Sequence, residues 1–358
     1  MIGILSQIPQ YRLFRSTGYP SKKPLNVTVS VTYKCNSHCK TCNVWKRHAD
    51  DLSVNEYDSI FGFLGKTPFW FTISGGEPFL RPDLVEICRS AYRNCKPQVI
   101  NIPTNGLLNN VIPSAVQEIV ESCPKTTVVI NLSLDGIGHQ HDEIRNVPGN
   151  WDKAMKTYRA LQELKLPNLE LGIHSVISKY NVEDIPQVCD YMIRELQPDS
   201  YITEIAEERV ELETVGADIT PPVEDYCKTI DYLSSAIKKQ RFSGFSRITQ
   251  SFRLEYYSLV RKILTERRQV IPCYAGFASA HIAPDGDVWA CCIRAEPMGN
   301  LREVDYDFSK VWLSQNAKEM RQRIKGKECY CPLANVSYTN MLCHIPTLAK
   351  VSRRIIAR

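Results

Sequence analysis

The 358-residue sequence lacks the features that mark several protein classes. No apolar run approaches the roughly 20 residues that cross a bilayer, and the run at 128–134 is already broken by Asn131. The amino terminus has no basic stretch followed by an apolar block and a small-residue cleavage site, so it does not resemble a signal peptide. Internal repeats and low-complexity tracts are also missing. We therefore expect a cytoplasmic globular protein, and the 43% of apolar residues is enough for a core.

Strong charge of either sign is missing as well, because the net charge is only +5. A nucleic-acid-binding protein is expected to carry a strongly basic surface interleaved with aromatic residues, so we expect no nucleic-acid partner. Basic residues are most concentrated in LAKVSRRIIAR at 348–358. This segment predicts a basic amphipathic helix, which either packs its apolar face onto the protein or makes peripheral contact with a membrane.

From residue 26 onward, short apolar runs alternate with longer segments of helical spacing. The runs predict six strands, at 26–33, 70–74, 99–104, 128–134, 169–177 and 200–205. The intervening segments predict helices at 54–64, 82–94, 111–122, 151–164 and 185–196, with Ser53 and Asn150 as N-caps. Such β–α units, with strands apolar on both faces, are typical of a parallel sheet covered by helices. The fold class is therefore α/β, either a partial barrel or an open doubly wound sheet.

Polar and glycine signatures follow four consecutive predicted strands. They are Cys35 after the first strand, Gly75–Gly76–Glu77 after the second, Asn105–Gly106 after the third and Asp135–Gly136 after the fourth. In both candidate folds the carboxyl ends of parallel strands carry the chemistry. These residues are therefore expected to form one site.

The fourteen cysteines fall into scattered and clustered groups. In a reducing compartment, clustered cysteines more often hold metal than form disulfides. Cys35, Cys39 and Cys42 form a C-x3-C-x2-C triad, whereas a second group lies between residues 273 and 343. Three thiolates suit either a zinc ion with an outside ligand, such as His38 or His48, or three corners of a cubane iron–sulfur cluster.

The triad followed by SGGEP at 74–78 resembles the radical S-adenosylmethionine (SAM) superfamily. The resemblance implies that Cys35, Cys39 and Cys42 hold a [4Fe–4S] cluster whose open iron binds SAM. It also implies that Glu77, at the rim, accepts a hydrogen bond from the methionine ammonium, and that glycines let the backbone approach SAM. Thr41 stands where many members carry an aromatic residue, so adenine stacking is expected from elsewhere, for instance Trp45. The implied SAM contacts are Gly75, Gly76, Glu77, Pro78, Asn105, Ser133, Asp135, Arg145, Val176 and Asn181.

The second cysteine group resembles the SPASM/twitch extensions of this superfamily. It begins with C-x12-G-x4-C and ends with CYCP at 329–332, and the PDGD turn at 284–287 predicts a β-hairpin between them. The resemblance implies one auxiliary [4Fe–4S] cluster, although a zinc site from the same residues stays open. Cys292 is either a small buried residue or a hydrogen-atom donor. The implied ligands are Cys273, Cys291, Cys329 and Cys331, with Cys343 as an alternative to either of the last two.

These features predict a partial (β/α)6 TIM-like barrel with a cysteine-rich β-hairpin and helix domain that binds the auxiliary cluster. The expected divisions are an N-terminal extension (1–25), the radical SAM core (26–206), a charged helical bridge (207–270), the auxiliary-cluster domain (271–345) and a basic tail (346–358).

The resemblance implies an enzyme that cleaves SAM reductively and abstracts a substrate hydrogen atom. Peptide-modifying members often carry an N-terminal peptide-recognition domain, for which a first strand near residue 26 leaves no room. We therefore expect a small-molecule substrate, sugar-like, cyclitol-like or lipid-linked, and an external electron donor such as flavodoxin or ferredoxin. The alternatives are a radical SAM maturase of a peptide or protein, and a non-catalytic zinc or iron–sulfur protein. Polar residues expected to face the cavity are His174, Glu204, Arg209, His281 and Arg294.

Overall fold

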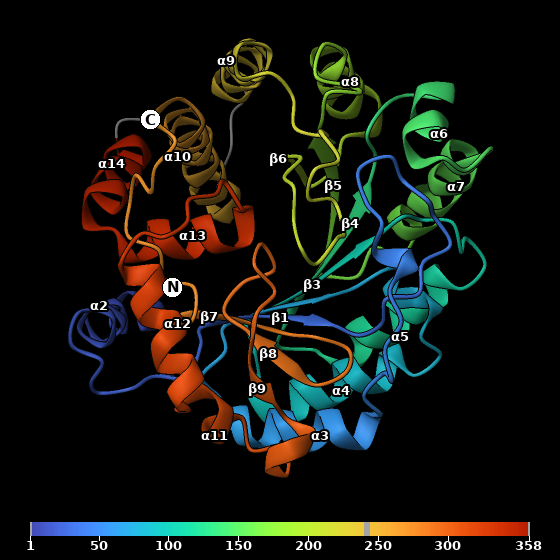
Figure 1. Ribbon diagram of the computed structural model, residues 1–358. Helices are drawn as coiled ribbons and strands as arrows, with labels where there is room; N and C mark the ends of the chain where they lie inside the picture. Colours follow the sequence, from blue (N-terminus) through green and yellow to red (C-terminus); the bar gives the residue numbers. More distant parts are fainter. Residues whose placement is uncertain (1, 240–243, 357–358) are drawn as a thin grey trace.

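The computed structural model describes residues 2–239 and 244–356. The ends of the predicted extension and tail, at residues 1 and 357–358, lie outside the described residues, as do residues 240–243 of the predicted bridge. The described chain is built around one nine-stranded sheet in the order β6-β5-β4-β3-β2-β1-β7-β8-β9. Figure 1 shows this curved sheet at the centre, with helices around its outside.

The first six strands are parallel and fall where the sequence predicts them. They are β1 (Asn26–Ser30), β2 (Trp70–Ser74), β3 (Val99–Thr104), β4 (Thr127–Ser133), β5 (Leu169–Ile177) and β6 (Ser200–Ile205). The α/β fold with a partial barrel is thus confirmed. Their parallel order brings all six carboxyl ends to one rim.

The helices that connect these strands also match the prediction, with one addition. They are α3 (Val54–Leu64), α4 (Leu84–Cys95), α5 (Ile112–Ser122), α6 (His139–Arg145), α7 (Asn150–Glu163) and α8 (Ile185–Tyr191), which continues as the π-helix η3 (Met192–Leu196). The short helix α6 was not expected. Two further 3-10 turns, η1 (Val44–Lys46) and η2 (Pro78–Leu80), lie in the loops after β1 and β2.

The two predicted N-caps have different outcomes. Ser53 caps α3 in a capping box, where its side chain accepts from the Glu56 backbone and the Glu56 carboxylate accepts from the Ser53 backbone. Asn150 was expected to cap α7, but this prediction is wrong because the cap is Gly149, at φ 72°. Asn150 is instead the buried first residue of the helix, with its Oδ1 3.2 Å from Nε2 of His141.

The auxiliary region extends the same sheet. β7 (Ser279–Ile282) pairs in parallel with β1, and the expected hairpin follows as β8 (Asp287–Trp289), antiparallel to β7. β9 (Pro297–Asn300) then pairs with β8. The remaining elements are η4 (Arg302–Val304), α11 (Phe308–Trp312), α12 (Gln315–Lys325) and α13 (Ala334–Cys343). Because β7 adjoins β1, the auxiliary region lies directly beside the strand that leads into the cysteine triad.

The predicted bridge is only partly helical. Its two helices, α9 (Val223–Lys239) and α10 (Gly244–Glu266), lie in the described part. The charged segment 207–213 was expected to be helical too, and this is wrong. There the Glu208 carboxylate accepts from the backbones of Gly216 and Asp218, and Val210 and Glu211 donate backbone hydrogen bonds to the loop after β8. These tertiary contacts hold the segment in turns.

Both ends of the described chain pack onto the auxiliary region (Figure 1). After α1 (Ile2–Leu5), α2 (Ile8–Thr17) contributes Arg15, whose Nε donates to the carbonyl of Cys273 at 2.8 Å. The predicted amphipathic helix of the tail is α14 (Ile345–Ile356), whose Arg354 pairs with Glu255 of α10. Among the described residues, no helix has both the length and the apolar character that crossing a bilayer requires.

Candidate active site

The cysteine loop after β1 is fastened to the glycine loop after β2. The Gly76 backbone N–H donates to the carbonyl of Thr32 at 2.8 Å, and the Glu77 N–H donates to that of Lys34 at 2.9 Å. These bonds continue the parallel pairing of β1 and β2 beyond the strands. The segment that carries Cys35 is therefore held to the sheet on one side.

Gly75 and Gly76 are required by this close approach of two loops. A Cβ at Gly76 would lie 2.2 Å from the Lys34 carbonyl oxygen, and one at Gly75, whose φ is 131°, would lie 2.2 Å from that of Thr32. The sequence suggested glycines that make room for SAM, whereas here they make room for the chain's own backbone. Direct contact of these glycines with SAM stays a prediction.

The three thiols of the triad lie close enough to influence one another. Burial, with a smaller contribution from the charge of Cys39, raises the pKa of Cys35 to about 11 and that of Cys42 to about 12. Their sulfur atoms are nevertheless not packed as tightly as around one ion. Only Glu211, His281 and Cys292, among the described residues, form a group of three ligand atoms within 4.8 Å of one another. Thiolates around one zinc ion would lie about 3.8 Å apart, so the wider triad suits a cluster of several irons.

The side chain of Glu77 is buried at the carboxyl end of β2. Only 1% of it is exposed, and its carboxylate accepts from the hydroxyl of Thr104 at 2.9 Å and from the backbones of Asn105 and Phe79. Burial raises the pKa of Glu77 to about 7, although these hydrogen bonds and the charge of Arg145 oppose the rise. Glu77 thus follows β2 at the rim formed by the strand ends, and the turn after β3 supplies donors that draw its carboxylate inward. Its hydrogen bond to the methionine ammonium stays a prediction.

Asn105 faces the triad as expected. Its amide nitrogen lies 3.9 Å from Sγ of Cys35 and donates to Oδ1 of Asn36 at 2.8 Å. Sequence reasoning missed Asn36, although its place directly after Cys35 was a usable signal. The amide thus lies beside a cluster thiolate.

Arg145, Asp135, Val176 and Asn181 meet in one network at the ends of β4 and β5. Nη2 of Arg145 lies 2.9 Å from Oδ2 of Asp135, and its Nη1 lies 3.8 Å from Sγ of Cys39. Oδ1 of Asp135 accepts from the Val176 backbone, and the amide of Asn181 donates to the carbonyls of Asp135 and Val176. Four predicted SAM-contact residues are therefore brought together beside the triad, with Asn181 fixing the loops.

The remaining predicted contacts lie along the same rim. Ser133 ends β4 and pairs with His174 of β5, whereas Pro78 begins η2 and is buried. Trp45, suggested for adenine stacking, packs against His38 with ring centroids 4.3 Å apart. His38 therefore pairs with an aromatic ring.

The four predicted auxiliary ligands gather in the SPASM-like region. Burial, with smaller contributions from the charges of Cys291 and Cys329, raises the pKa of Cys273 to about 12. Burial raises the pKa of Cys331 well above its ordinary value, with Glu207, Cys291 and Cys273 adding to the effect. Cys343 has different neighbours, because it influences Tyr11 and Tyr274 and is itself affected by Arg12. The geometry favours the set without Cys343.

Charged side chains line the space between the two cysteine groups. Arg209 lies 3.7 Å from Glu207 and 4.0 Å from Glu204, and Glu204 lies 3.6 Å from His174. Both oxygens of Glu207 are buried with no hydrogen-bond donor among the described residues, and burial raises its pKa to about 7. Sequence reasoning proposed His174, Glu204 and Arg209 but missed Glu207, even though EER at 207–209 follows the end of β6.

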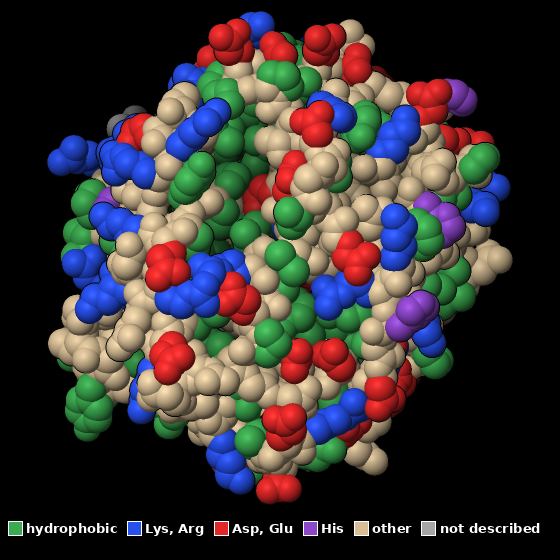
Figure 2. All heavy atoms as spheres, viewed as in Figure 1, with side chains coloured by type: hydrophobic (Ala, Val, Ile, Leu, Met, Phe, Trp, Pro, Cys, Tyr) green, Lys and Arg blue, Asp and Glu red, His purple; other side chains and the backbone are tan. Residues whose placement is uncertain are grey.

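Glu211 connects the two cysteine groups electrostatically. Its charge raises the pKa of Cys42 in the triad and also that of Cys292, which adjoins Cys291. Sequence reasoning missed Glu211 too. Arg294, also proposed for the cavity, instead pairs with Glu296 at 2.6 Å. Burial raises the pKa of Cys329, and the charge of Arg294 opposes this rise. The space between the triad and the auxiliary cysteines is where a substrate would meet both. Figure 2 shows this face hollowed near its centre, with an acidic side chain deep in the hollow.

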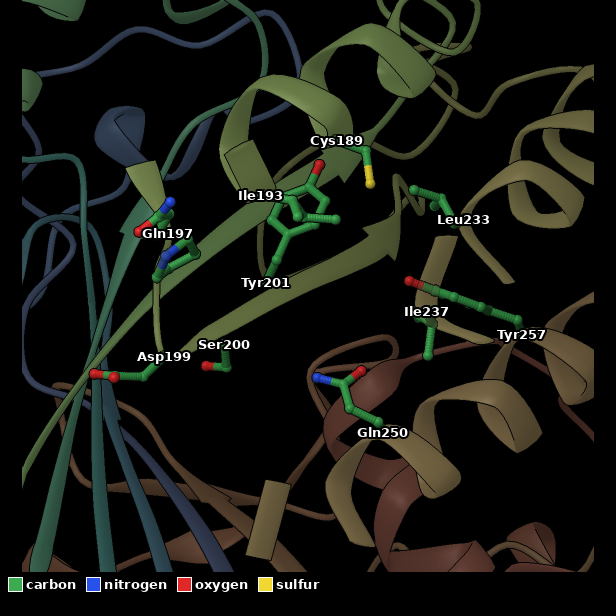
Figure 3. Close-up of a pocket in the computed structure, with 11 residues that line it drawn as sticks. Cys189, Ile193, Gln197, Asp199, Ser200, Tyr201, Leu233, Ile237, Gln250 and Tyr257 are labelled. Carbon is green, nitrogen blue, oxygen red and sulfur yellow. The ribbon is translucent and has the colours of Figure 1, made fainter. Parts of the chain in front are cut away.

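A separate cavity of about 200 Å³ lies between β6, α9 and α10. Figure 3 shows its lining, which includes Ser200, Gln250 and Tyr257. None of the predicted site residues lines this cavity. Ser200 begins β6, so the cavity lies toward the amino end of that strand, away from the cysteine rim.

Two family models match the chain in its two cysteine regions. The model described as the radical SAM superfamily matches residues 29–192, and the iron–sulfur cluster-binding SPASM model matches residues 273–332. The chain belongs to the radical SAM superfamily. The prediction of a radical SAM enzyme is thereby confirmed, as are its cofactors, a [4Fe–4S] cluster with SAM and an auxiliary iron–sulfur centre.

Curated relatives align over different lengths. Fe-coproporphyrin III synthase of Methanosarcina barkeri is 31% identical over 183 residues, which are 49% of this chain and 43% of that protein. Mycofactocin maturase MftC of Mycobacterium tuberculosis is 23% identical and covers 86% of this chain and 75% of its own. AdoMet-dependent heme synthase of M. barkeri is 24% identical and covers 87% and 90%. The chain thus spans less than half of the first relative and most of the other two.

A solved structure supports the fold. Streptococcus suis SuiB bound to precursor peptide SuiA aligns with a TM-score of 0.63 over 88% of this chain and 70% of that one, at 17% identity. This likeness shows that the fold is shared.

The described residues fit the cofactors of the superfamily. The cluster that binds SAM would be held by Cys35, Cys39 and Cys42. Beside them, the buried Nε–H of Arg145 has no hydrogen-bond partner among the described residues, so it is available to a bound group. When bound, that cluster supplies the electron that cleaves SAM to a 5′-deoxyadenosyl radical. Cys273, Cys291, Cys329 and Cys331 offer four thiolates, the ligand number of an ordinary [4Fe–4S] cluster.

Proposed function

We propose that the chain is a radical SAM maturase that modifies a peptide or protein. The observation that carries this proposal is the alignment with mycofactocin maturase MftC over 86% of the chain, which must include most of both cysteine regions. The fold shared with SuiB, a protein solved with its precursor peptide, supports the same substrate class. A subtilosin bacteriocin biosynthesis protein, AlbA of Bacillus subtilis, also aligns over 87% of the chain.

The arrangement of charges supports a substrate held between the two cysteine groups. Arg209 can orient a carbonyl or carboxylate, whereas Glu207 has two buried oxygens ready to accept hydrogen bonds from amide or ammonium groups. A peptide backbone offers both kinds of partner. Glu207 also lies close enough to Cys331 to raise the pKa of that thiol, so a substrate bound to the Glu207 carboxylate would lie near the auxiliary centre.

The small sugar-like or cyclitol-like substrate expected from the sequence receives less support than the peptide. The second candidate is instead a tetrapyrrole, because AdoMet-dependent heme synthase aligns over 90% of its own length. We also propose an external electron donor such as flavodoxin or ferredoxin. Peripheral membrane contact through α14 stays a prediction.

The test uses anaerobically reconstituted enzyme, SAM and a chemical reductant. It is offered, in parallel, short peptides encoded next to its gene and iron coproporphyrin. We expect a mass change in one peptide, with deuterium from the labelled peptide appearing in 5′-deoxyadenosine. Conversion of the porphyrin with no change in any peptide would replace the first candidate with the second.

A further inference from the structure

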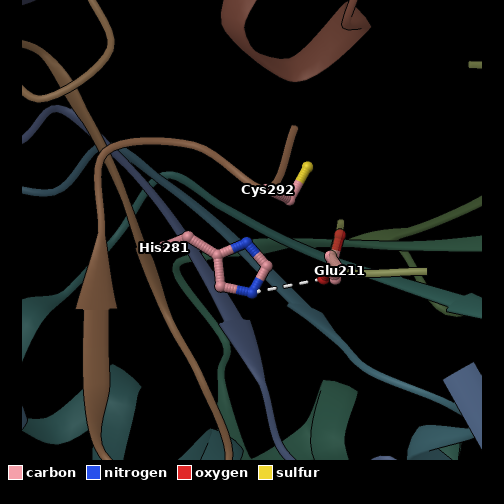
Figure 4. A group of neighbouring side chains, drawn as sticks. All are labelled: Glu211, His281 and Cys292. Carbon is pink, nitrogen blue, oxygen red and sulfur yellow. Dashed lines mark ion pairs between the residues drawn. The ribbon is translucent and has the colours of Figure 1, made fainter. Parts of the chain in front are cut away.

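Glu211, His281 and Cys292 form a compact group that neither predicted cluster uses. One ligand atom from each lies within 4.8 Å of the other two, and Nε2 of His281 lies 3.4 Å from Oε1 of Glu211. Figure 4 shows His281 and Glu211 facing each other, with Cys292 beside them on a separate segment. All three are buried, with 8%, 4% and 8% of each residue exposed. Carboxylate, imidazole and thiolate are the three ligand types that zinc takes in proteins.

The group is held in place by the surrounding backbone. The Glu211 N–H donates to the carbonyl of Cys292 at 3.3 Å, and the carbonyl of Glu211 accepts from Nη1 of Arg47 at 3.1 Å. His281 lies within β7, and its ring packs against Trp289 of β8 with centroids 4.9 Å apart. A site of this kind costs little to organise because its ligands are already positioned.

Polar side chains contact the three proposed ligands, in the way that hydrogen-bonding neighbours orient the ligands of metal sites. Oγ of Ser30 lies 2.9 Å from Nε2 of His281 and 3.4 Å from Oε1 of Glu211. Nη1 of Arg209 lies 3.8 Å from Sγ of Cys292, where it can stabilise a thiolate. Each ligand thus has a polar neighbour that can orient it.

The charge of the surroundings also suits a cation. Three carboxylates, those of Glu204, Glu207 and Glu211, lie near Arg209, and the thiolate of Cys292 would add a fourth negative group. Arg47 is the other cationic side chain that acts on this space. Because burial raises the pKa of Glu207 to about 7, that carboxyl is only partly ionised at neutral pH. The carboxylates of Glu204 and Glu211 balance the two guanidinium groups. The Cys292 thiolate formed on metal binding then adds a negative charge that a divalent ion would offset.

We propose that Glu211, His281 and Cys292 bind one Zn²⁺ ion between the two clusters. Ligand atoms about 2.0 to 2.3 Å from zinc lie roughly 3.3 to 3.8 Å apart, so small side-chain movements close the group around the ion. Binding releases the thiol proton of Cys292 to solvent, and the ion takes the thiolate, the neutral imidazole and the carboxylate as ligands. Three protein ligands leave the fourth position open for an oxygen or nitrogen atom of the substrate.

The zinc ion would lie in the space where the proposed function places the substrate. Glu211 lies near enough to Cys42 to act on it electrostatically, and Cys292 adjoins Cys291, so the ion would lie near both cysteine groups. A substrate carbonyl bound there would be fixed relative to both centres. Zinc binding itself does not depend on the identity of the substrate, and it can be measured without one.

The experiment titrates Zn²⁺ into anaerobically reconstituted enzyme whose iron and sulfide content is complete, so that the cluster cysteines are already occupied. Bound zinc is quantified after gel filtration, and zinc-edge X-ray absorption reports its ligands. The variants are His281→Gln, Glu211→Gln and Cys292→Ser. Cys95→Ser is the matched control, since Cys95 is buried in α4 and donates only to the carbonyl of Phe61.

We expect about one zinc per chain in the wild type and in Cys95→Ser, with one sulfur ligand at about 2.3 Å and the rest nitrogen or oxygen. The three site variants should bind zinc at least about tenfold more weakly while keeping their iron. No zinc in the wild type, equal affinity in His281→Gln, or a purely sulfur ligand shell would each overturn the proposal. Because no peptide is present, these outcomes are independent of the peptide assay.

Discussion

Arg145 and Asp135 form a buried ion pair, with 2.9 Å between Nη2 and Oδ2, directly beside the cysteine triad. Side-chain exposure is 11% for the arginine and 1% for the aspartate. Nη1 of the arginine also lies 3.8 Å from Sγ of Cys39, so one guanidinium connects the end of β4 with a predicted cluster ligand. The positive charge of Arg145 can balance thiolates of the triad, but a buried guanidinium is destabilising when its carboxylate partner is removed.

Removing the carboxylate of this pair should destabilise the protein strongly. Asp135→Asn leaves the Arg145 charge buried without its partner, so the free energy of unfolding of the cluster-free protein should fall by about 3 kcal/mol. Urea denaturation measures it. The control is Asp218→Asn, which removes an ion pair between the exposed side chains of Asp218 and Lys179 and should change stability far less, because solvent screens that pair. Equal losses in both variants would contradict the role given to Asp135.

Filling the space at Gly76 should separate the cysteine loop from the sheet. In Gly76→Ala the new Cβ would meet the Lys34 carbonyl at 2.2 Å, and relief of this contact should cost about 1 to 3 kcal/mol. We expect reconstituted iron to fall because the triad moves. Gly62→Ala in α3 is the control, since the nearest atom to its Cβ would be Oδ1 of Asn94 at an ordinary contact distance of 3.9 Å, and alanine favours a helix. Normal iron binding by Gly76→Ala would show that the loop tolerates the shift.

Much of this architecture could be predicted from the sequence because its signals are local. The six strand runs, the Ser53 capping box and the PDGD hairpin depend on neighbouring residues, and all three appear in the structure. The order of motifs on successive strand ends likewise placed Asn105, Asp135 and Arg145 near the triad.

What sequence reasoning missed depends on long-range contacts. The helical pattern of residues 207–213 is overridden by pairing with the loop after β8, some 80 residues later, and this change brings Glu207 and Glu211 into the site. Similarly, the addition of β7 beside β1 cannot be inferred from the hairpin alone. The inward orientation of the Glu77 carboxylate depends on hydrogen bonds from Thr104 and Asn105, which lie 27 and 28 residues further along the chain.

Glu207 should make the stability of the cluster-free protein depend on pH. Burial raises its pKa from 4.5 to about 7, so between these values the folded protein holds a proton that the unfolded chain has lost. Stability should therefore fall as the pH rises through this window. Glu207→Gln removes the effect, and at about pH 8 it should stabilise the protein by up to about 3 kcal/mol relative to wild type.

Denaturation at several pH values tests this prediction. Glu77 has a similarly raised pKa and remains in the variant, so the pH dependence should be reduced and not abolished. Parallel pH profiles for wild type and Glu207→Gln would show that Glu207 is ionised in the folded protein over the whole range.

The assignment of the auxiliary ligands is tested by comparing two cysteines that lie near each other in sequence. Wild-type enzyme should contain about eight irons per chain, from two four-iron clusters. Cys331→Ser removes a thiolate that interacts with Cys273 and Cys291, so iron should fall toward four while SAM cleavage continues. Cys343→Ser should keep about eight irons, because that thiol lies with Tyr11 and Tyr274. Loss of iron in Cys343→Ser but not in Cys331→Ser would make Cys343, and not Cys331, the auxiliary ligand. Electron paramagnetic resonance spectra of each variant would show which of the two clusters is affected.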